Sequence, residues 1–306
     1  MGSRAKERTE IHIDGKAVAI THPDKPLWPE KGLNKIDYLQ YLRDVSDFML
    51  PFLRERDLTV IRYPHGAGGE KFFQKNCPDY APDFIRTHET HDIDYIICSD
   101  LATLMWLGNQ LAFELHVPFQ TIHTTGPSEI VFDLDPPSRN EFGLAVEAAL
   151  MIKEILINLN LTSFVKTSGN KGLQIYIPLP ENAFSYEETR KFTQFIADFL
   201  TEKESKWFTT ERLKKNRGNR LYVDYLQHAE GKTIVAPYSV RGNKEALVAT
   251  PLEWEEVTRD LRPEQFPMDT TIKRIKEKGC PFEKFWQAKP NQPFEPVLRW
   301  LAEKGV

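Results

Sequence analysis

The sequence predicts an α+β fold with a mixed or mainly antiparallel central sheet, flanking helices and an N-terminal lobe. Helical patterns alternate with short, hairpin-like strand patterns, without the regular β-α-β rhythm of a parallel sheet. The 306 residues are 41% hydrophobic and 27% charged, which is ordinary for a soluble protein with a sizeable core. Motifs are densest between residues 130 and 241, so we expect a catalytic lobe there.

The elements follow from periodicity and capping signals. We expect Asn34 to cap a helix that ends near residue 53, and Ser185 with Glu188 to form a capping box before another helix. Apolar spacing predicts further helices over residues 100–110, 141–160 and 296–302. Short strands are predicted at residues 58–62, 112–116, 120–123, 129–135, 164–167, 173–177, 220–226 and 233–236.

These elements suggest a tail, two lobes and a C-terminal extension. We expect a linker or tail over residues 1–20, an N-terminal lobe over about 21–120, a catalytic lobe over about 121–250, and helices over about 251–306. The net charge of −4 does not indicate a nucleic-acid binder, although local patches decide that question. Three widely spaced cysteines and the absence of a long apolar run favour a cytoplasmic location and no membrane contact.

Three aspartates carry the strongest chemical signal. Asp133 and Asp135 alternate with apolar residues in one strand, so both side chains share a face. A second apolar strand supplies Asp224, and three adjacent carboxylates can hold two Mn²⁺ or Mg²⁺ ions for phosphoryl transfer. The D-x-D pair alone fits two other interpretations: a glycosyltransferase that uses a nucleotide sugar, or acids that cap a turn.

Two further segments could bind phosphate. The loop 167–172 offers glycines, the Ser168 hydroxyl and the Lys171 charge, although an ordinary hairpin turn has the same composition. It is not a Walker A loop. Arg241 follows an apolar strand and could donate bidentately to a triphosphate. Five cations between residues 212 and 220 could follow a nucleic-acid backbone or belong to a solvated helix end.

These pieces together resemble the polymerase domain of bacterial ATP-dependent DNA ligase D, a member of the archaeo-eukaryotic primase superfamily. The resemblance spans about residues 20 to 290. Its motifs are HPDKPLWP at 22–29 with Lys35 downstream, FFQK at 72–75, ELH at 114–116, VFDLDP at 131–136, TSGNKG at 167–172, VDYLQ at 223–227 and APYSVR at 236–241.

The resemblance implies a primase-polymerase-like fold and a template-directed nucleotidyltransferase of non-homologous end joining. Such an enzyme fills gaps and extends 3′ ends at DNA breaks with two Mn²⁺ or Mg²⁺ ions, favours ribonucleotides, and works near the bacterial nucleoid with Ku and a ligase domain. It also implies residue roles. Those residues are Asp133, Asp135 and Asp224 for catalysis and metal; His116, Ser168, Lys171, Gln174, Gln227 and Arg241 for the NTP or dNTP; His22, Lys25 and Lys35 for a DNA 5′-phosphate; and Phe72 and Phe73 for the template.

Two positions depart from the family pattern. Gln174 stands where the family usually has His, and His22 stands where it usually has Asn. A glutamine amide carries no charge, so we expect weaker triphosphate binding from position 174. A non-catalytic module that binds DNA ends is a third interpretation, in which the acids are structural. An assay with Mn²⁺, a gapped duplex, NTPs and UDP-sugars distinguishes all three.

Overall fold

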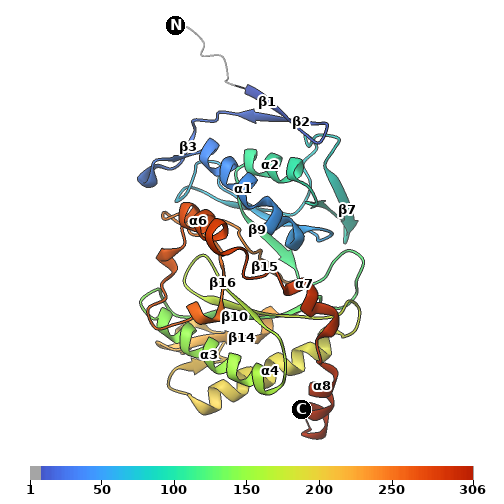
Figure 1. The fold of residues 1–306 in the computed structure, drawn as a ribbon, viewed down its shortest axis with the longest axis vertical. Helices are drawn as coiled ribbons and strands as arrows, with labels where there is room; N and C mark the ends of the chain where they lie inside the picture. The colour runs from blue at the N-terminus through green and yellow to red at the C-terminus, as the bar shows by residue number, and fades with distance from the viewer. Residues whose placement is uncertain (1–7, 306) are drawn as a thin grey trace. The chain divides into compact units, whose positions relative to one another are not determined.

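The computed structural model describes residues 8–305, which divide into two units (Figure 1). Among the described residues, the first unit contains residues 8–117, 234–249 and 266–277, and the second contains residues 118–233, 250–265 and 278–305. Each unit is therefore built from three separate stretches of the chain. The lobe boundary expected near residue 120 lies close to the first division, but residues 234–249 join the first unit rather than the catalytic lobe expected to contain them.

The first unit has a four-stranded sheet of order β15-β9-β5-β6, with helices α1 and α2 packed against each other. Its aromatic core stacks Phe113 of β9 between Trp28 and Tyr63, with ring centroids 4.3 and 5.0 Å away. The bounds are β1 Arg8–Ile13, β2 Lys16–Thr21, β3 Pro26–Trp28, η1 Pro29–Lys31, β4 Leu33–Asn34, α1 Lys35–Leu53, β5 Thr59–Arg62, β6 Phe72–Gln74, β7 Arg86–Thr90, β8 Ile93–Ile97, α2 Leu101–Asn109, β9 Ala112–Pro118, β15 Thr233–Val235 and α6 Met268–Lys278.

The second unit has a six-stranded sheet of order β13-β14-β10-β12-β11-β16. All neighbours pair antiparallel except β13 and β14, so the sheet is mixed. The bounds are β10 Glu129–Asp135, α3 Phe142–Asn158, β11 Phe164–Thr167, β12 Leu173–Pro178, α4 Tyr186–Lys203, β13 Phe208–Thr209, α5 Lys214–Arg217, β14 Leu221–Asp224, η2 Tyr225–Gln227, β16 Pro251–Leu252, η3 Trp254–Glu256, η4 Pro263–Gln265, α7 Phe285–Ala288, η5 Lys289–Asn291 and α8 Glu295–Glu303.

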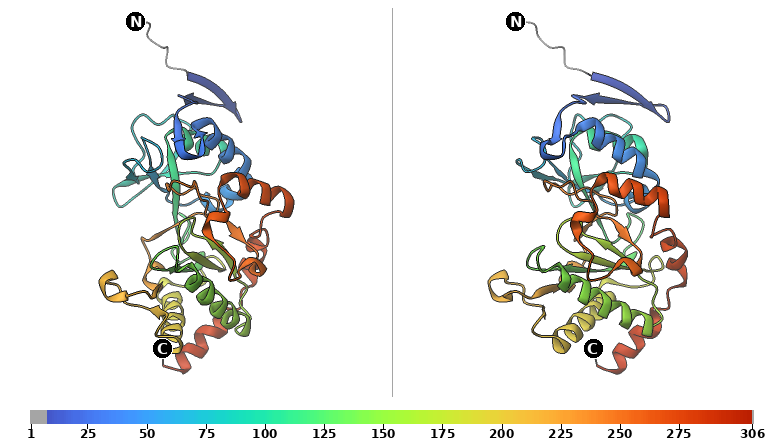
Figure 2. Two further views of the ribbon diagram at one scale, coloured as in Figure 1. Left: turned by 90° about the vertical axis from the view of Figure 1, so that its left-hand side faces the viewer. Right: turned by 60° about the vertical axis from the view of Figure 1, so that its left-hand side comes forward.

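Helices α3 and α4 lie side by side against one face of this second sheet (Figures 1 and 2). Phe132 of β10 is buried on that face, where its ring meets Phe192 of α4 at a centroid distance of 6.1 Å. Because successive side chains of a strand point to opposite faces, Asp133 and Asp135 lie on the face away from these helices. The alternation in β10 therefore separates an apolar core from an acidic surface.

The α+β class with a mixed sheet is confirmed, and the predicted helices are present. Asn34 caps a helix as expected, through a capping box with Asp37, and Ser185 forms the expected capping box with Glu188. Three predictions were wrong in detail. Residues 120–123 form a turn, in which the Thr124 N–H donates to the Thr121 carbonyl, instead of a strand. The strand expected over 220–226 ends at Asp224, whose side chain caps a 3-10 turn. Residues 8–20, expected within a tail, belong to the β1–β2 hairpin, which ends at Thr21; residues 1–7 lie outside the described residues.

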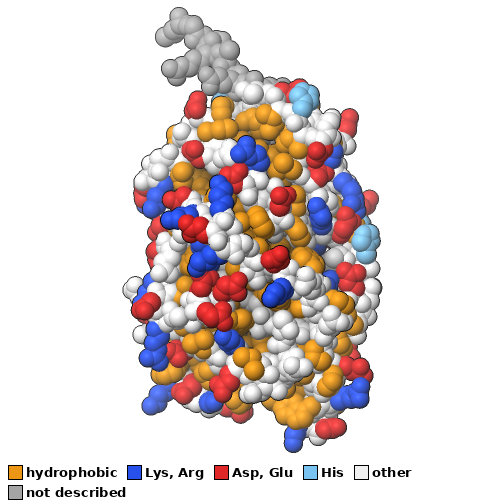
Figure 3. Space-filling view, in the orientation of Figure 1, with side chains coloured by type: hydrophobic (Ala, Val, Ile, Leu, Met, Phe, Trp, Pro, Cys, Tyr) orange, Lys and Arg blue, Asp and Glu red, His pale blue; other side chains and the backbone are white. Residues whose placement is uncertain are grey.

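No helix within residues 8–305 is long and apolar enough to cross a membrane. Over the described residues, the face drawn in Figure 3 mixes cationic, anionic and apolar side chains in small groups. This mixture agrees with a net charge close to zero, and it directs attention to local clusters of charge rather than to the total.

Candidate functional site

The three predicted aspartates lie on neighbouring strands of the second unit. The antiparallel register places Asp133 of β10 directly opposite Asp224 of β14, and Asp135 follows two residues later on the same face. Burial, followed by repulsion from Asp135 and Asp224, raises the pKa of Asp133 to about 6, although a hydrogen bond from Gln174 acts in the opposite direction. Burial also raises the pKa of Asp224. The fold therefore brings three carboxylates together in a partly buried place, where ionisation of Asp133 and Asp224 is less favourable.

Each carboxylate has its own partner. Lys171 Nζ lies 2.9 Å from Asp135 Oδ1. The Tyr222 hydroxyl and the Gln227 backbone N–H each donate to Asp224 Oδ1 over 3.0 Å. Gln174 Nε2 donates to Asp133 Oδ1 over 3.0 Å. These bonds supply part of the compensation that a cluster of acids needs.

The donor set suits a hard divalent cation. Within residues 8–305, no three His, Cys, Asp or Glu side chains are already gathered as a ligand set. Asp133, Asp135 and Asp224 nevertheless provide carboxylate oxygens on one sheet face, the donor type that Mg²⁺ and Mn²⁺ prefer. A bound cation would remove the repulsion that raises the pKa of Asp133. The residues therefore fit the metal expected from the sequence.

The loop between β11 and β12 forms the predicted phosphate-binding segment. Ser168 Oγ accepts from the backbone N–H groups of Gly172 and Asn170 over 3.0 and 3.3 Å. Its hydroxyl proton is then the group that Ser168 can donate to a ligand. Lys171 Nζ also donates to the carbonyls of Pro136 and Pro137, at 2.6 and 3.2 Å. The loop thus presents an ammonium beside the carboxylates.

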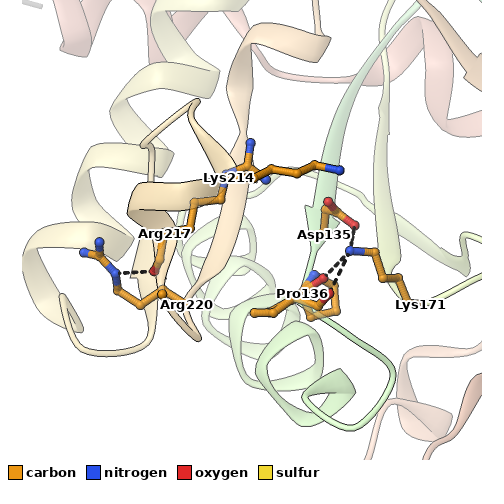
Figure 4. Close-up of a pocket in the computed structure, with 8 residues that line it drawn as sticks. Asp135, Pro136, Lys171, Lys214, Arg217 and Arg220 are labelled. Atoms are coloured by element: carbon orange, nitrogen blue, oxygen red, sulfur yellow. Dashed lines mark hydrogen bonds and ion pairs between the residues drawn. The ribbon is translucent and has the colours of Figure 1, made fainter.

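A cationic pocket of roughly 170 Å³ opens next to Asp135 (Figure 4). Lys171 bonds Asp135 on one side, while the other cations line the opposite side. The Arg217 guanidinium lies 3.7 Å from the centroid of the Tyr222 ring, whose hydroxyl holds Asp224. The lining residues are Asp135, Pro136, Pro137, Lys171, Lys214, Arg217, Gly218 and Arg220. Part of the basic segment noted in the sequence therefore adjoins the acidic cluster.

His116 and Arg241, both predicted to bind nucleotide, meet at a buried carboxylate in the first unit. Glu114 Oε2 lies 3.2 Å from His116 Nε2 and 3.3 Å from Arg241 Nε. Its Oε1 accepts from the Tyr63 hydroxyl over 2.6 Å and from the Gly242 N–H over 3.2 Å. Burial opposes ionisation, but the hydrogen bond from His116, the Arg241 charge and Tyr63 outweigh it and hold the pKa of Glu114 at about 2.

The three residues predicted to bind a 5′-phosphate lie before and at the start of α1. Lys35 is buried and donates to the Thr21 carbonyl over 2.6 Å, and Lys25 donates to the Pro64 carbonyl over 2.6 Å. Burial, and next the charge of Lys25, lowers the pKa of Lys35 to about 8. His22 is exposed and has a left-handed backbone, with φ of 50°. The two ammonium groups are therefore close enough to repel each other.

The predicted template residues are on the surface of the first unit. Phe72 and Phe73 of β6 are 43% and 69% exposed, which is unusual for phenylalanine outside a binding surface. The Arg62 guanidinium lies 5.3 Å from the Phe72 ring centroid. An exposed aromatic ring beside an arginine, as at Phe72, can stack on a base of a single strand.

The structure thus gathers the aspartates, Ser168, Lys171, Gln174 and Gln227 in the second unit, and the remaining predicted residues in the first. Gln227 Nε2 donates to the Thr233 carbonyl over 2.7 Å. Sequence reasoning missed the roles of Glu114 and Lys166, which contact predicted residues. The signal for Glu114 was its place two residues before His116, on the same strand face.

Comparison with known proteins gives one consistent result. Residues 34–282 match the family described as LigD, primase-polymerase domain. The bifunctional non-homologous end joining protein LigD of Bacillus subtilis is 54% identical over 286 residues, which cover 94% of this chain and 47% of that protein. The multifunctional LigD of Mycolicibacterium smegmatis is 32% identical over 270 residues, covering 86% of this chain and 35% of that protein.

A solved structure agrees with these sequence matches. The polymerase domain from Mycobacterium tuberculosis ligase D, in complex with DNA, superposes with a TM-score of 0.82 at 30% identity. The match covers 89% of this chain and 99% of that domain. The chain therefore spans about half or less of the length of the curated relatives, and nearly all of the solved domain.

Proposed function

The chain belongs to the LigD primase-polymerase domain family, and we propose that it adds nucleotides to DNA 3′ ends at gaps and double-strand breaks. Membership makes it a nucleotidyltransferase. The observation that carries the proposal is the register that sets Asp133 against Asp224, with Asp135 on the same face. If the chain were a D-x-D glycosyltransferase, Asp224 would have no role. If the acids only capped turns, the raised pKa of Asp133 would have no functional explanation.

In this proposal the three aspartates bind two catalytic metal ions, which are Mn²⁺ or Mg²⁺. The ions supply charge neutralisation of the triphosphate and activation of the primer 3′-hydroxyl. Lys171 is the counter-ion of Asp135. A cation held by Asp135 would compete with this ion pair, and the Lys171 ammonium could then pair with a phosphate.

In this proposal, hydrogen-bond donors from the loop 167–172 and from Arg241 hold the incoming nucleotide. Ser168 supplies a hydroxyl, Lys171 an ammonium, and Arg241 a guanidinium whose geometry suits phosphate oxygens. Glu114 orients Arg241 and His116 together, since one carboxylate oxygen contacts both. Gln227 lies beside Asp224 through its backbone N–H. We further propose that NTPs are used at least as well as dNTPs.

The DNA contacts and partners follow from the remaining sites. Lys25 and Lys35 bind a downstream 5′-phosphate with His22 beside them, and Phe72 and Phe73 stack near the template. The relatives are named for non-homologous end joining and are about twice as long or longer than this chain. We therefore propose that the domain acts with a ligase domain, in the same chain or another, and with Ku at the DNA end.

A single set of reactions tests the proposed function. The protein is incubated with Mn²⁺, a gapped duplex that has a labelled primer, and one NTP, dNTP or UDP-sugar at a time. We expect template-directed extension of the primer with NTPs and dNTPs, and no transfer from UDP-sugars. DNA binding without extension would support the non-catalytic end-binding module instead, and sugar transfer would support the glycosyltransferase.

A further inference from the structure

Four polar residues form a row across the acidic face of the second sheet. Lys166 of β11 is paired in register with Gln174 of β12, which is paired with Asp133 of β10, which is paired with Asp224 of β14. Direct partners in antiparallel strands project to the same face, so the row runs from a cation, through a neutral amide, to two acids. Lys166 and Gln174 are 0% and 3% exposed, which is exceptional for these residue types.

Hydrogen bonds connect the first three members of the row. Lys166 Nζ donates to Gln174 Oε1 over 2.6 Å, and Gln174 Nε2 donates to Asp133 Oδ1 over 3.0 Å. An ammonium can only donate, so the amide oxygen must face Lys166 and the amide nitrogen must face Asp133. The opposite orientation would set an NH₂ group against the ammonium and an oxygen against the carboxylate, with two repulsive contacts in a buried place.

We infer that Gln174 is a positioning residue for the metal ligand Asp133, held in its orientation by Lys166, and is not a ligand of the incoming nucleotide. This inference deepens the proposed function and rests on it. The hydrogen bond from the Gln174 side-chain amide engages Oδ1 of Asp133 and so holds the orientation of this carboxylate. Both ends of the amide have strong partners, and turning the amide to a phosphate would break both bonds.

The expected size of the effect comes from other metal sites. Groups that hydrogen-bond a metal ligand typically change the metal affinity by about 10- to 100-fold when removed. Gln174 carries no charge, so its removal changes the orientation of Asp133 without changing the net charge of the site. We therefore expect Gln174→Leu to weaken Mn²⁺ binding by about tenfold, the lower end of that range.

The decisive measurement is the affinity for Mn²⁺ alone, by calorimetry or by electron paramagnetic resonance, without DNA or nucleotide. The control is Gln292→Leu, because Gln292 is also a buried glutamine of the second unit, bonded to both backbone groups of Thr162. Weaker binding in Gln174→Leu and unchanged binding in Gln292→Leu supports the inference. Equal Mn²⁺ affinity in Gln174→Leu and the unmodified protein, with a raised nucleotide KM, would make Gln174 a phosphate ligand and overturn it.

Failure of the inference is distinguishable from failure of the proposed function. An unmodified protein that binds Mn²⁺ and extends primers keeps the function, whatever Gln174→Leu does. An unmodified protein that does neither removes the function and the inference together.

A second readout examines Lys166 without using metal. The side-chain NH₂ signals of Gln174 are assigned in a ¹⁵N–¹H spectrum by their loss in Gln174→Leu. In Lys166→Met, we expect these two signals to shift or broaden, because the amide loses the partner that fixes its orientation. Lys289→Met is the matched control, since Lys289 is another buried lysine of this unit and is paired with Glu181. Gln174 signals that are the same in Lys166→Met and the control would show that Lys166 does not set the orientation.

Discussion

At the scale of single residues, the acids of the two units are charged for different reasons. Burial, and next the charges of Asp135 and Asp224, raise the pKa of Asp133, so ionisation of Asp133 destabilises the folded state. Glu114 is also buried, yet a histidine, an arginine and a tyrosine keep its pKa low, so its ionisation is favourable. The ionised carboxylate of Asp133 therefore reduces the stability of the fold, while that of Glu114 stabilises the structure around it.

The first prediction follows from the elevated pKa of Asp133. A carboxyl whose pKa rises from 3.8 to about 6 on folding binds its proton more tightly in the folded state, so stability is lost as the pH rises from about 4 to 6. Asp133→Asn removes that cost and still accepts from Gln174. We expect about 1–3 kcal/mol of added stability at pH 7.5 without metal. Urea denaturation measures it.

The same variant should lose nucleotide addition to below about a thousandth of the unmodified rate, since a metal ligand is gone. Asp198→Asn is the control, because Asp198 lies on helix α4 and its carboxyl also has a raised pKa, chiefly from burial. Retained activity in Asp133→Asn would remove Asp133 from the catalytic site.

The second prediction concerns Glu114. Its pKa falls from 4.5 to about 2 on folding, so its contribution is complete above about pH 4.5 and is lost as the pH falls towards 2. We expect Glu114→Gln to cost about 3 kcal/mol at pH 7. The loss at pH 3 should be clearly smaller. Guanidinium denaturation at both pH values measures the difference, and an equal loss at pH 7 and pH 3 would contradict the charged state assigned to Glu114.

At the scale of elements, the strands carry the site and their alternation was predictable. The sequence predicted that Asp133 and Asp135 share a face, and the contact of Phe132 with α4 confirms which face is the core. The row from Lys166 to Asp224 was not predictable, because strand order and register depend on contacts between segments far apart in sequence. The false strand at residues 120–123 shows that the β-branched residues Thr121 and Ile122 do not determine a strand without a partner to pair with.

The third prediction concerns the approach of β12 to β10. A Cβ atom at Gly172 would lie 2.2 Å from the backbone oxygen of Leu134, so the two strands must separate to admit it. We expect Gly172→Ala to cost at least about 2 kcal/mol and to reduce nucleotide addition, because the loop with Ser168 and Lys171 shifts away from β10. Thermal unfolding and primer extension measure the two effects.

Gly143→Ala is the matched control for this prediction. Gly143 lies in helix α3, and an added Cβ meets nothing within 4 Å. Alanine is the better helix former, so we expect a gain of about 0.5–1 kcal/mol with unchanged activity. A Gly172→Ala protein as stable as Gly143→Ala would show that the strands tolerate separation.

At the scale of the whole molecule, the chain returns to the first unit after the carboxylate strands are complete. Residues 234–249 supply Arg241 to Glu114, although about 120 residues separate them in sequence. The sequence predicts that each lobe is one continuous segment. That division does not allow residues 234–249 to belong to the first unit. The assignment of Arg241 to nucleotide binding stays a prediction, which came from its place after an apolar strand and from the family resemblance.

The last prediction concerns recognition of a broken DNA end. Lys35 has a pKa of about 8, chiefly through burial, so it is charged at pH 7 and largely neutral at pH 9. A terminal phosphate has its second pKa near 6 and is a dianion throughout this range. The favourable pairing therefore exists at pH 7 and is lost as the pH rises through 8. Binding of phosphate should in turn raise the pKa of Lys35, because the two equilibria are linked.

We expect a gap with a downstream 5′-phosphate to bind about tenfold more tightly than the same gap with a 5′-hydroxyl at pH 7, and the ratio to be smaller at pH 9. Fluorescence anisotropy at one fixed salt concentration measures both affinities, because phosphate contacts weaken with salt. Lys25→Ala combined with Lys35→Met should abolish the preference at pH 7 and leave Mn²⁺ binding unchanged. Lys31→Ala, an exposed lysine in the same segment, should keep the preference. Equal affinity for the two gaps at pH 7 would show that this pair of lysines binds no terminal phosphate.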